Sequence, residues 1–294
     1  TGPNGFKGIF MPMSNYPTGF ANGISIRGVP LLQTHPGLVY WVYNGTTLDT
    51  GHKNGSDGNA GTFNAPFATL DYAIGRCRAN KGDIIMIKPG HAETVSSATA
   101  LALDMAGVAI VGLGIGSNRP TFTLDTATTA TVGVTAANMA IQNVVFSANF
   151  ADIVSVFTLV AAKYFTVNKC DFVATATNMN FLHVIDTGTV TADADGLSVT
   201  NCKWLEPDAA TLAFALVDGT NAGWEINDNV VVNGAATADV AAMFTCATAK
   251  ILTQATCLRN NVQITGNAAS VAGLWLTTDA TTHTGIMAYN NLKH

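Results

Sequence analysis

Two aspartates carry the clearest catalytic chemistry that this sequence offers. Asp186 and Asp218 each follow a short apolar run, and their spacing would place them one coil apart in a repeating fold. Two carboxylates hydrolyse a glycosidic bond at separations of about 5–5.5 Å for retention or about 6.5–9.5 Å for inversion. Stacked at equivalent positions, they would share a proton, and the pKa of one would rise. We favour the other interpretation, that Asp-Thr-Gly and Asp-Gly-Thr at these positions are ordinary turn sequences.

A lyase would need a cationic base beside acids that hold Ca²⁺. Residues 126–294 hold few cations, and of these only Lys203 lies near Glu206 and Asp208 in the sequence. The acidic stretch 193–196, which contains Asp193 and Asp195, is too short to match a calcium loop. The sequence therefore predicts neither a lyase base nor a metal site.

The histidines and tryptophans favour packing over chemistry. His183 lies inside an apolar run and is expected in the core or in an interface. The other histidines show no metal-ligand spacing: His35, His52, His91, His283 and His294. Trp204, Trp224 and Trp275 recur in the repeats of the second half of the chain. We expect them to pack in the core or in subunit contacts; stacking against sugar rings is the alternative.

Neither the cysteines nor the glycine-rich segment predicts a cofactor site. The five cysteines are odd in number and contain no C-x-x-C pair, so we expect small buried side chains: Cys77, Cys170, Cys202, Cys246 and Cys257. Residues 112–116 read G-x-G-x-G after a strand, but Pro120 stands where a nucleotide-binding helix should run. A tight turn between strands is the better interpretation, and no cofactor is expected.

Composition limits the possible functions. Of 294 residues, 48% are hydrophobic and 11% are charged, against about 25% charged in an ordinary globular chain. The surface must therefore be mostly neutral, or lie in subunit contacts. The net charge of −5, from 14 basic and 19 acidic residues, argues against a nucleic-acid partner. No apolar run is long enough for a membrane helix, and we expect no secretory signal at the N-terminus.

Residues 1–50 cannot build a core of their own. Glycine and proline recur throughout, and the apolar residues between them stand singly or in pairs. We interpret the segment as an extended arm that becomes ordered against another surface; a poorly ordered N-terminus is the alternative. The residues expected to contact a capsid or a neighbouring subunit are Tyr16, Phe20, Ile24, Ile26, Arg27, Leu31 and Leu32.

Residues 51–125 are expected to hold a helix and the first strands. Pro66 suits a first helical turn, and Phe67, Leu70, Ala73, Ile74 and Cys77 form one apolar stripe. The expected strands cover residues 84–87, 108–111 and 121–124.

Residues 126–294 repeat at steps of 26 to 32 residues, each repeat carrying two short apolar runs. This pattern predicts a parallel β-solenoid with about three strands per coil; a β-sandwich would instead show hairpins every 8–12 residues. Stacking places like residues above one another. The expected inward column is Val144, Cys170, Cys202, Val230, Val262 and Leu292. Beside it we expect a hydrogen-bonded asparagine column, broken by Lys169: Asn143, Asn201, Asn229, Asn261 and Asn291.

Two resemblances follow from these motifs. The helix, the segment Gly82–Gly90, the segment Gly107–Gly114 and Asn118-Arg119-Pro120 resemble the opening of the pectate-lyase-like right-handed parallel β-helix superfamily. This implies an all-β, right-handed parallel β-helix with an N-terminal capping helix, to which residues 1–50 add the extended N-terminal arm. Residues 16–23, 27–30 and 67–76 are similar to small β-helix structural proteins of tailed bacteriophages, which include capsid decoration (cement) proteins, usually trimers.

Two classes of function are therefore weighed. The expectation is a non-enzymatic virion protein: a homotrimer on the outer capsid surface, assembled in the host cytoplasm, that clamps the major capsid protein through its arm. No membrane partner, metal or cofactor is expected, and no receptor-binding domain after Lys293-His294. The alternative is a short tail fibre or tailspike component that binds, or weakly hydrolyses, host polysaccharide.

Overall fold

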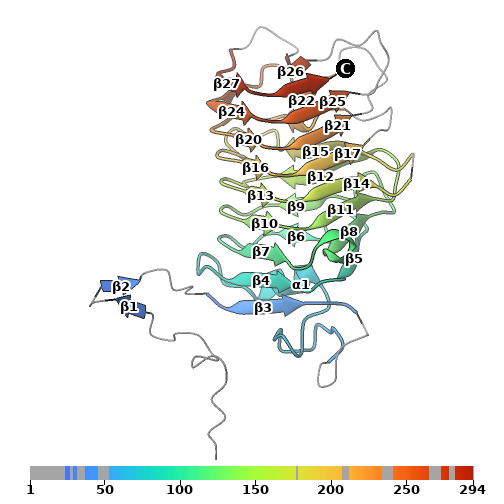
Figure 1. The fold of residues 1–294 in the computed structure, drawn as a ribbon, viewed down its shortest axis with the longest axis vertical. Coiled ribbons are helices and arrows are strands. Elements are labelled where there is room, and N and C mark those ends of the chain that lie inside the picture. The colour runs from blue at the N-terminus through green and yellow to red at the C-terminus, as the bar shows by residue number, and fades with distance from the viewer. Residues whose placement is uncertain are drawn as a thin grey trace, which may run out of the picture. The chain divides into compact units, whose positions relative to one another are not determined.

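The computed structural model describes residues 24–26, 29–31, 37–45, 53–176, 178–206, 212–233, 241–264, 273–277 and 282–293. The chain divides into two units, Thr1–Pro36 and Gly37–His294. The second unit is a solenoid of stacked coils, whose strands form three parallel sheets (Figure 1). This confirms the expected all-β parallel solenoid.

The three sheets are named here by their number of strands. The nine-stranded sheet contains β3 (Val39–Val42), β4 (Ile84–Ile87), β7 (Ala109–Gly112), β10 (Ala140–Gln142), β13 (Thr166–Asn168), β16 (Ser198–Thr200), β20 (Glu225–Asn227), β24 (Ala255–Leu258) and β27 (Gly285–Ala288). The eight-stranded sheet contains β5 (Ala92–Val95), β8 (Thr121–Leu124), β11 (Val145–Ala148), β14 (Asp171–Ala174), β17 (Lys203–Glu206), β21 (Val230–Asn233), β25 (Asn261–Ile264) and β28 (Asn291–Lys293). The seven-stranded sheet contains β6 (Ala102–Leu103), β9 (Val132–Val134), β12 (Ile153–Leu159), β15 (Phe181–Thr187), β18 (Ala215–Val217), β22 (Ala241–Cys246) and β26 (Gly273–Thr277). A short parallel pair, β19 (Asn221–Ala222) and β23 (Leu252–Thr253), lies beside them.

Burial alternates along the strands, as the apolar runs predict. In β4, β7 and β8 every second residue is buried, because successive side chains of a strand point to opposite faces of its sheet. The second apolar run of each repeat lies in the seven-stranded sheet. Three strands per coil, as expected, therefore enclose one apolar interior.

A left-handed residue turns the chain from the nine-stranded to the eight-stranded sheet in six successive coils. Its φ angle lies between 54° and 60° at Asn143, Lys169, Asn201, Asp228, Arg259 and Tyr289. Asparagine and aspartate adopt this conformation more readily than lysine, arginine or tyrosine. The corner is thus imposed by the stacking of the coils rather than by local preference.

The inward column next to this corner follows the prediction for three coils only. Val144, Cys170 and Cys202 each directly precede the register partners Val145, Asp171 and Lys203. Lys203 then pairs with Val230, which pairs with Asn261 and so with Asn291. The column therefore continues through Asn229, Asn260 and Asn290, and not through Val230, Val262 and Leu292 as expected.

The error comes from aligning Asn229, Asn261 and Asn291 with the corner residue Asn143, whereas Asp228, Arg259 and Tyr289 occupy that corner. The predicted column is therefore one residue late at Val230 and two residues late at Val262 and Leu292. A slip of one residue moves a side chain to the other face of the sheet. Asn229 and Asn260 are buried, whereas Asn261 and Asn291 lie exposed on the outward face.

The inward asparagines form a hydrogen-bonded ladder along the axis. Nδ2 of Asn229 donates to Oδ1 of Asn260 at 3.0 Å, and Nδ2 of Asn260 donates to Oδ1 of Asn290 at 3.0 Å. Each Oδ1 also accepts a main-chain N–H from the preceding coil, at 2.9–3.0 Å. Each Nδ2 also donates to a main-chain carbonyl, that of Val199, Ile226 or Cys257. Full hydrogen bonding allows these amides to replace apolar side chains in the interior.

Aromatic rings fill the interior beside the ladder. Phe122, Phe146 and Phe172 are in register on β8, β11 and β14, with ring centroids 5.9 and 5.8 Å apart. Trp204 continues the column on β17, and both Trp204 and Trp224 are fully buried. All five cysteines are buried and free, which confirms their expected packing role.

Helix α1 (Leu70–Arg76) covers one end of the solenoid. It buries Leu70, Ala73 and Ile74, and begins after its N-cap Thr69. Pro66 and Phe67, expected in its first turn, precede it, because the Thr69 side chain accepts from the N–H of Tyr72 and fixes the start there.

Hydrogen bonds tie α1 to the terminal strands of two sheets. The Asp71 carboxylate accepts from the N–H of Ala102 on β6 at 3.0 Å, and the Glu93 carboxylate on β5 accepts from the N–H of Leu70 at 3.0 Å. The helix therefore satisfies part of a sheet edge that would otherwise be open.

The structure places the segment boundaries differently from the sequence. Strand β3 lies within residues 1–50 but pairs with β4 in the solenoid, so the first unit ends at Pro36. No boundary lies at residue 125, because β8 and β11 on either side of it pair in one sheet. Residues 112–116 enter a turn that ends in the short 3₁₀ helix Gly116–Asn118, as expected. In the described ranges no helix is long and apolar enough to span a membrane.

Replacing Asn260 by alanine should destabilise the solenoid. The change leaves buried N–H and carbonyl partners unsatisfied, so we expect the free energy of unfolding to fall by about 2–4 kcal/mol. Urea denaturation followed by circular dichroism measures it. The matched control Asn261→Ala removes an exposed side chain and should change stability by less than about 0.5 kcal/mol. Equal losses in the two variants would contradict the ladder.

Candidate functional site

The expected contact residues of the arm fall partly on a β-hairpin. Strand β1 (Ile24–Ile26) pairs antiparallel with β2 (Val29–Leu31), in the register Ile24 to Leu31, Ser25 to Pro30 and Ile26 to Val29. Ile24, Ile26 and Leu31 therefore lie on these strands. Tyr16, Phe20, Arg27 and Leu32 lie outside the described residues.

The hairpin belongs to the unit Thr1–Pro36 and joins none of the three solenoid sheets. An isolated two-stranded hairpin is at best marginally stable in water. In the part of the chain that the structure describes, no third strand pairs with either β1 or β2, and a strand edge of this kind can accept another strand. The arrangement is suited to binding a partner.

The two candidate catalytic aspartates do not occupy equivalent positions. Asp186 lies on β15 and pairs with Leu216 of β18, two residues before Asp218. The expectation that they stack directly is therefore wrong, and Asp186 lies in a strand rather than in a turn. They still interact: burial, and secondly the charge of Asp218, raise the pKa of Asp186 to about 6.

His183 is a packed residue, as expected. It is 4% exposed, and its Nδ1 lies 2.8 Å from the carbonyl oxygen of Ala213, so Nδ1 carries the proton. Burial lowers the pKa of His183 to about 4. The side chain is therefore neutral at pH 7 and a weak base.

Hydroxyl groups lie next to His183 and Asp186 on the same sheet. Register pairs Ser155 with His183 and Thr158 with Asp186. The Ser155 hydroxyl lies 3.1 Å from that of Thr158, which lies 3.1 Å from that of Thr131. A serine, a histidine and an aspartate thus come together, but the His183 Nδ1–H is committed to a main-chain carbonyl rather than to a carboxylate. This is not the arrangement of a nucleophilic triad.

The other residues considered for chemistry have structural surroundings. Asp193 is buried, with Oδ1 accepting from the N–H of Ala161, and Asp195 lies 3.7 Å from Lys163. Trp224 Nε1 donates to the carbonyl of Ala194 at 2.8 Å. Trp204 and Trp224 are core residues, as we favoured, and Trp275 lies on β26. Asp208 lies outside the described residues. Among the described residues, no three His, Cys, Asp or Glu side chains form a group that could hold a metal ion.

A cluster that the sequence analysis did not predict lies at the corner between the nine-stranded and eight-stranded sheets. There Arg119, Lys169 and Lys203 surround Asp171 in one pocket. The signal was available in the repeats, since aligning the segments that begin at Val167 and Val199 places Asp171 level with Lys203.

Comparisons with known proteins give little further guidance. No protein-family model matches the chain, and no curated protein matches it. Among solved structures, a rhamnogalacturonan lyase matches with a TM-score of 0.41 and 12% identity, over 78% of this chain and 73% of the lyase chain. A match of this quality carries no argument about activity or substrate. The fold therefore rests on the strand pairing described above.

Replacing Asp186 by asparagine should make stability less dependent on pH. Folding raises the pKa of Asp186 from its usual value near 3.8 to about 6, so the native state binds this proton more tightly than the unfolded state. The wild type should lose stability as pH rises from 4 through 6. Above pH 7 the wild type must bury a charged carboxylate, so Asp186→Asn should be more stable by on the order of 2 kcal/mol. A tenfold difference in proton affinity between the native and unfolded states corresponds to about 1.4 kcal/mol.

Urea denaturation at pH 4 and at pH 7.5 measures both proteins. At pH 4 they should be nearly equal, because Asp186 is then protonated in the native state. Asp104→Asn, which changes an exposed aspartate, should show no such difference between the two pH values. A difference between wild type and Asp186→Asn that is the same at both pH values would contradict the raised pKa.

Proposed function

We propose that this chain is a non-enzymatic structural protein of a tailed-bacteriophage virion, a trimeric decoration protein that clamps capsid subunits. The observation that carries the proposal is the division of the chain: residues 1–36 form a unit of their own, and its hairpin pairs with none of the described solenoid strands. This is the organisation expected of an attachment arm on a stiff body. The resemblance to capsid decoration proteins supplies the class of partner.

The register of the hairpin favours an apolar contact. Because successive residues of a strand alternate between faces, Ile24, Ile26, Val29 and Leu31 occupy positions on one face of the ribbon. Ser25 and Pro30 occupy the other. A face of four apolar residues on a marginal hairpin gains most by packing against a second surface.

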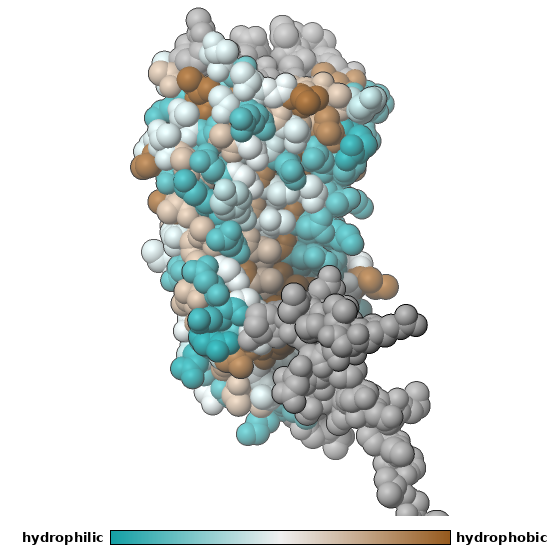
Figure 2. All heavy atoms as spheres, turned by 90° about the vertical axis from the view of Figure 1, so that its left-hand side faces the viewer, coloured by the Kyte–Doolittle hydropathy of each residue, from teal (hydrophilic) through white to brown (hydrophobic). Residues whose placement is uncertain are grey.

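The solenoid offers a surface that copies of the chain can share. In the described strands of the nine-stranded sheet, Glu225 is the one charged residue at an outward position. The outward residues of its first three strands are all apolar: Val39, Trp41, Ile84, Met86, Ala109 and Val111. Depletion of charge is typical of the core of a subunit interface. On one face of the solenoid, Figure 2 shows pale and brown residues, of intermediate and high hydropathy, lying between groups of hydrophilic residues in teal.

Trimerisation and arm binding together would provide the strength of attachment. Three arms on one trimer bind three neighbouring subunits, so each contact raises the effective concentration of the others. The proposed location is the outer capsid surface after assembly in the host cytoplasm, with the major capsid protein as partner. No nucleic acid, membrane or cofactor takes part in this scheme.

Deleting residues 1–36 should abolish capsid binding while leaving a folded trimer. The deletion ends before β3, so the solenoid keeps all its strands. Co-sedimentation with capsids that lack the protein should show binding at least tenfold weaker, while circular dichroism and sedimentation velocity remain those of the full chain.

Two further measurements sharpen this test. The double variant Ile24→Ser/Ile26→Ser keeps the arm length and should also lose binding, whereas Ser25→Ala on the other face should not. Quantitative mass spectrometry of purified virions should find the protein in hundreds of copies, as a head lattice requires. Normal binding by the truncated protein, or a handful of copies per virion, would overturn the proposal.

One observation favours a second candidate, a tail fibre or tailspike component that binds or weakly hydrolyses host polysaccharide. A carboxyl group with its pKa raised to about 6 beside a second carboxyl is the pairing that a glycosidase uses as general acid. If the chain acts in this way, Asp186→Asn and Asp218→Asn should each lower the release of reducing sugar from host polysaccharide by at least 100-fold. No activity in the wild type, or no change in the variants, would exclude this candidate.

A further inference from the structure

A pocket of about 330 Å³ lies at the corner between the nine-stranded and eight-stranded sheets. It spans successive coils, because its residues come from the same corner of neighbouring repeats. The residues that line it are Gly116, Arg119, Asn143, Lys169, Asp171, Asn201 and Lys203. A water molecule occupies about 30 Å³ in the liquid, so the pocket has room for a small anion with several waters.

One cation of the pocket is held in place by the fold. The Arg119 guanidinium forms an ion pair with the Asp171 carboxylate, and its Nη1 donates to the main-chain carbonyl of Lys169 at 3.3 Å. Its side chain is 15% exposed. Arg119 and Asp171 therefore neutralise each other.

Two cations remain without a counter-charge. In the part of the chain that the structure describes, Nζ of Lys169 and Nζ of Lys203 form no ion pair or hydrogen bond. Lys169 stands at the left-handed corner position, and Lys203 lies directly beside Asp171 in the ladder. Three cations and one carboxylate give the pocket a charge of +2, on a chain whose net charge is −5.

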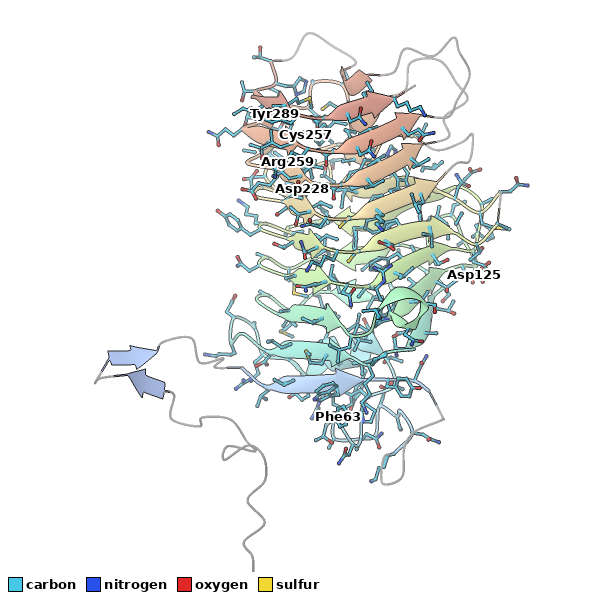
Figure 3. All side chains as sticks on the ribbon, viewed as in Figure 1. Phe63, Asp125, Asp228, Cys257, Arg259 and Tyr289 are labelled. Carbon is cyan, nitrogen blue, oxygen red and sulfur yellow. The ribbon has the colours of Figure 1, made fainter. Side chains whose placement is uncertain are left out.

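The same corner is balanced farther along the solenoid. There Asp228 and Arg259 occupy the left-handed positions of successive coils and form a bidentate pair, with two contacts of 2.7 Å. Figure 3 shows them one above the other, below Tyr289. The corner can thus bring opposite charges of successive coils together, and here one arginine neutralises one aspartate. The pocket departs from this pattern by two uncompensated lysines.

We propose that this pocket binds a doubly charged oxyanion, a phosphate or sulfate group, between the ammonium groups of Lys169 and Lys203. The charge of such a group matches the uncompensated charge of the pocket. Lysine binds phosphate as a point charge. The Arg119 guanidinium, whose planar set of N–H donors would favour a carboxylate, is already paired with Asp171. The side-chain amide of Asn201, which makes no hydrogen bond within the described residues, is a further donor at the rim. This site goes beyond the proposed attachment role and does not depend on it.

Isothermal titration calorimetry of the full chain tests the site with inorganic phosphate and inorganic sulfate. Sodium chloride holds the ionic strength constant, because salt screens exposed charges. The wild type should bind both ions saturably. Lys169→Gln/Lys203→Gln should weaken binding at least tenfold, while circular dichroism stays unchanged.

The matched control Lys53→Gln/Lys81→Gln removes two exposed lysines outside the pocket. It lowers the net charge equally and should change affinity by less than twofold. Dextran sulfate and uncharged dextran then distinguish the source of the anion. If dextran sulfate binds more tightly than inorganic sulfate and the pocket variant loses this binding, the ligand is a sulfate group carried on a polysaccharide. If it does not, the ligand is the free ion. The proposal is overturned if neither inorganic ion binds the wild type, or if the pocket and control variants bind alike.

Discussion

Main-chain hydrogen bonding between successive coils is the constraint on which the rest of this structure depends. Except at the ends of the three sheets, each of their strands pairs in parallel with the equivalent strands of the coils before and after it. Parallel strands lie about 4.8 Å apart, so every side chain has a fixed neighbour above and below. Apolar stacking follows inside, as in the phenylalanine column, and the buried asparagine amides form hydrogen bonds along the same axis. The asparagine ladder lies at the end where the apolar residues Val144, Cys170 and Cys202 give way to amides.

The same constraint determines how charge is arranged outside. With 11% charged residues, few positions carry charge, and stacking brings those that do into contact with their equivalents. Asp228 and Arg259 become partners in this way, and Arg119 reaches Asp171 from a different position of the same corner, although each pair is distant in the sequence. Lys169 and Lys203 enter the second group without a partner. The proposed anion site is therefore a consequence of axial register, and a shift of one residue would separate its members.

The arm is not subject to this constraint. Residues 1–36 form their own unit, and their hairpin joins none of the solenoid sheets. A body stabilised by repeated internal pairing can present such a segment without depending on it for stability. This separation of tasks supports an attachment role. The raised pKa of Asp186 is a feature that would suit an enzyme, but its neighbours His183 and Ser155 have structural partners.

The sequence determined the fold class and most of the strands, because alternation and a repeat near 30 residues are visible without coordinates. It also placed His183, Trp204, Trp224 and the cysteines in the interior, and assigned residues 112–116 to a turn. Only the tertiary structure decided the register: Asn260 rather than Val262 continues the inward column after Asn229, Asp186 lies beside Leu216 rather than Asp218, and β3 joins the solenoid. The physical reason is that residue type reveals whether a position prefers the interior, whereas a shift of one or two residues changes no local preference. Hydrogen bonding between whole coils selects among such registers, and that pairing exists only in the folded chain.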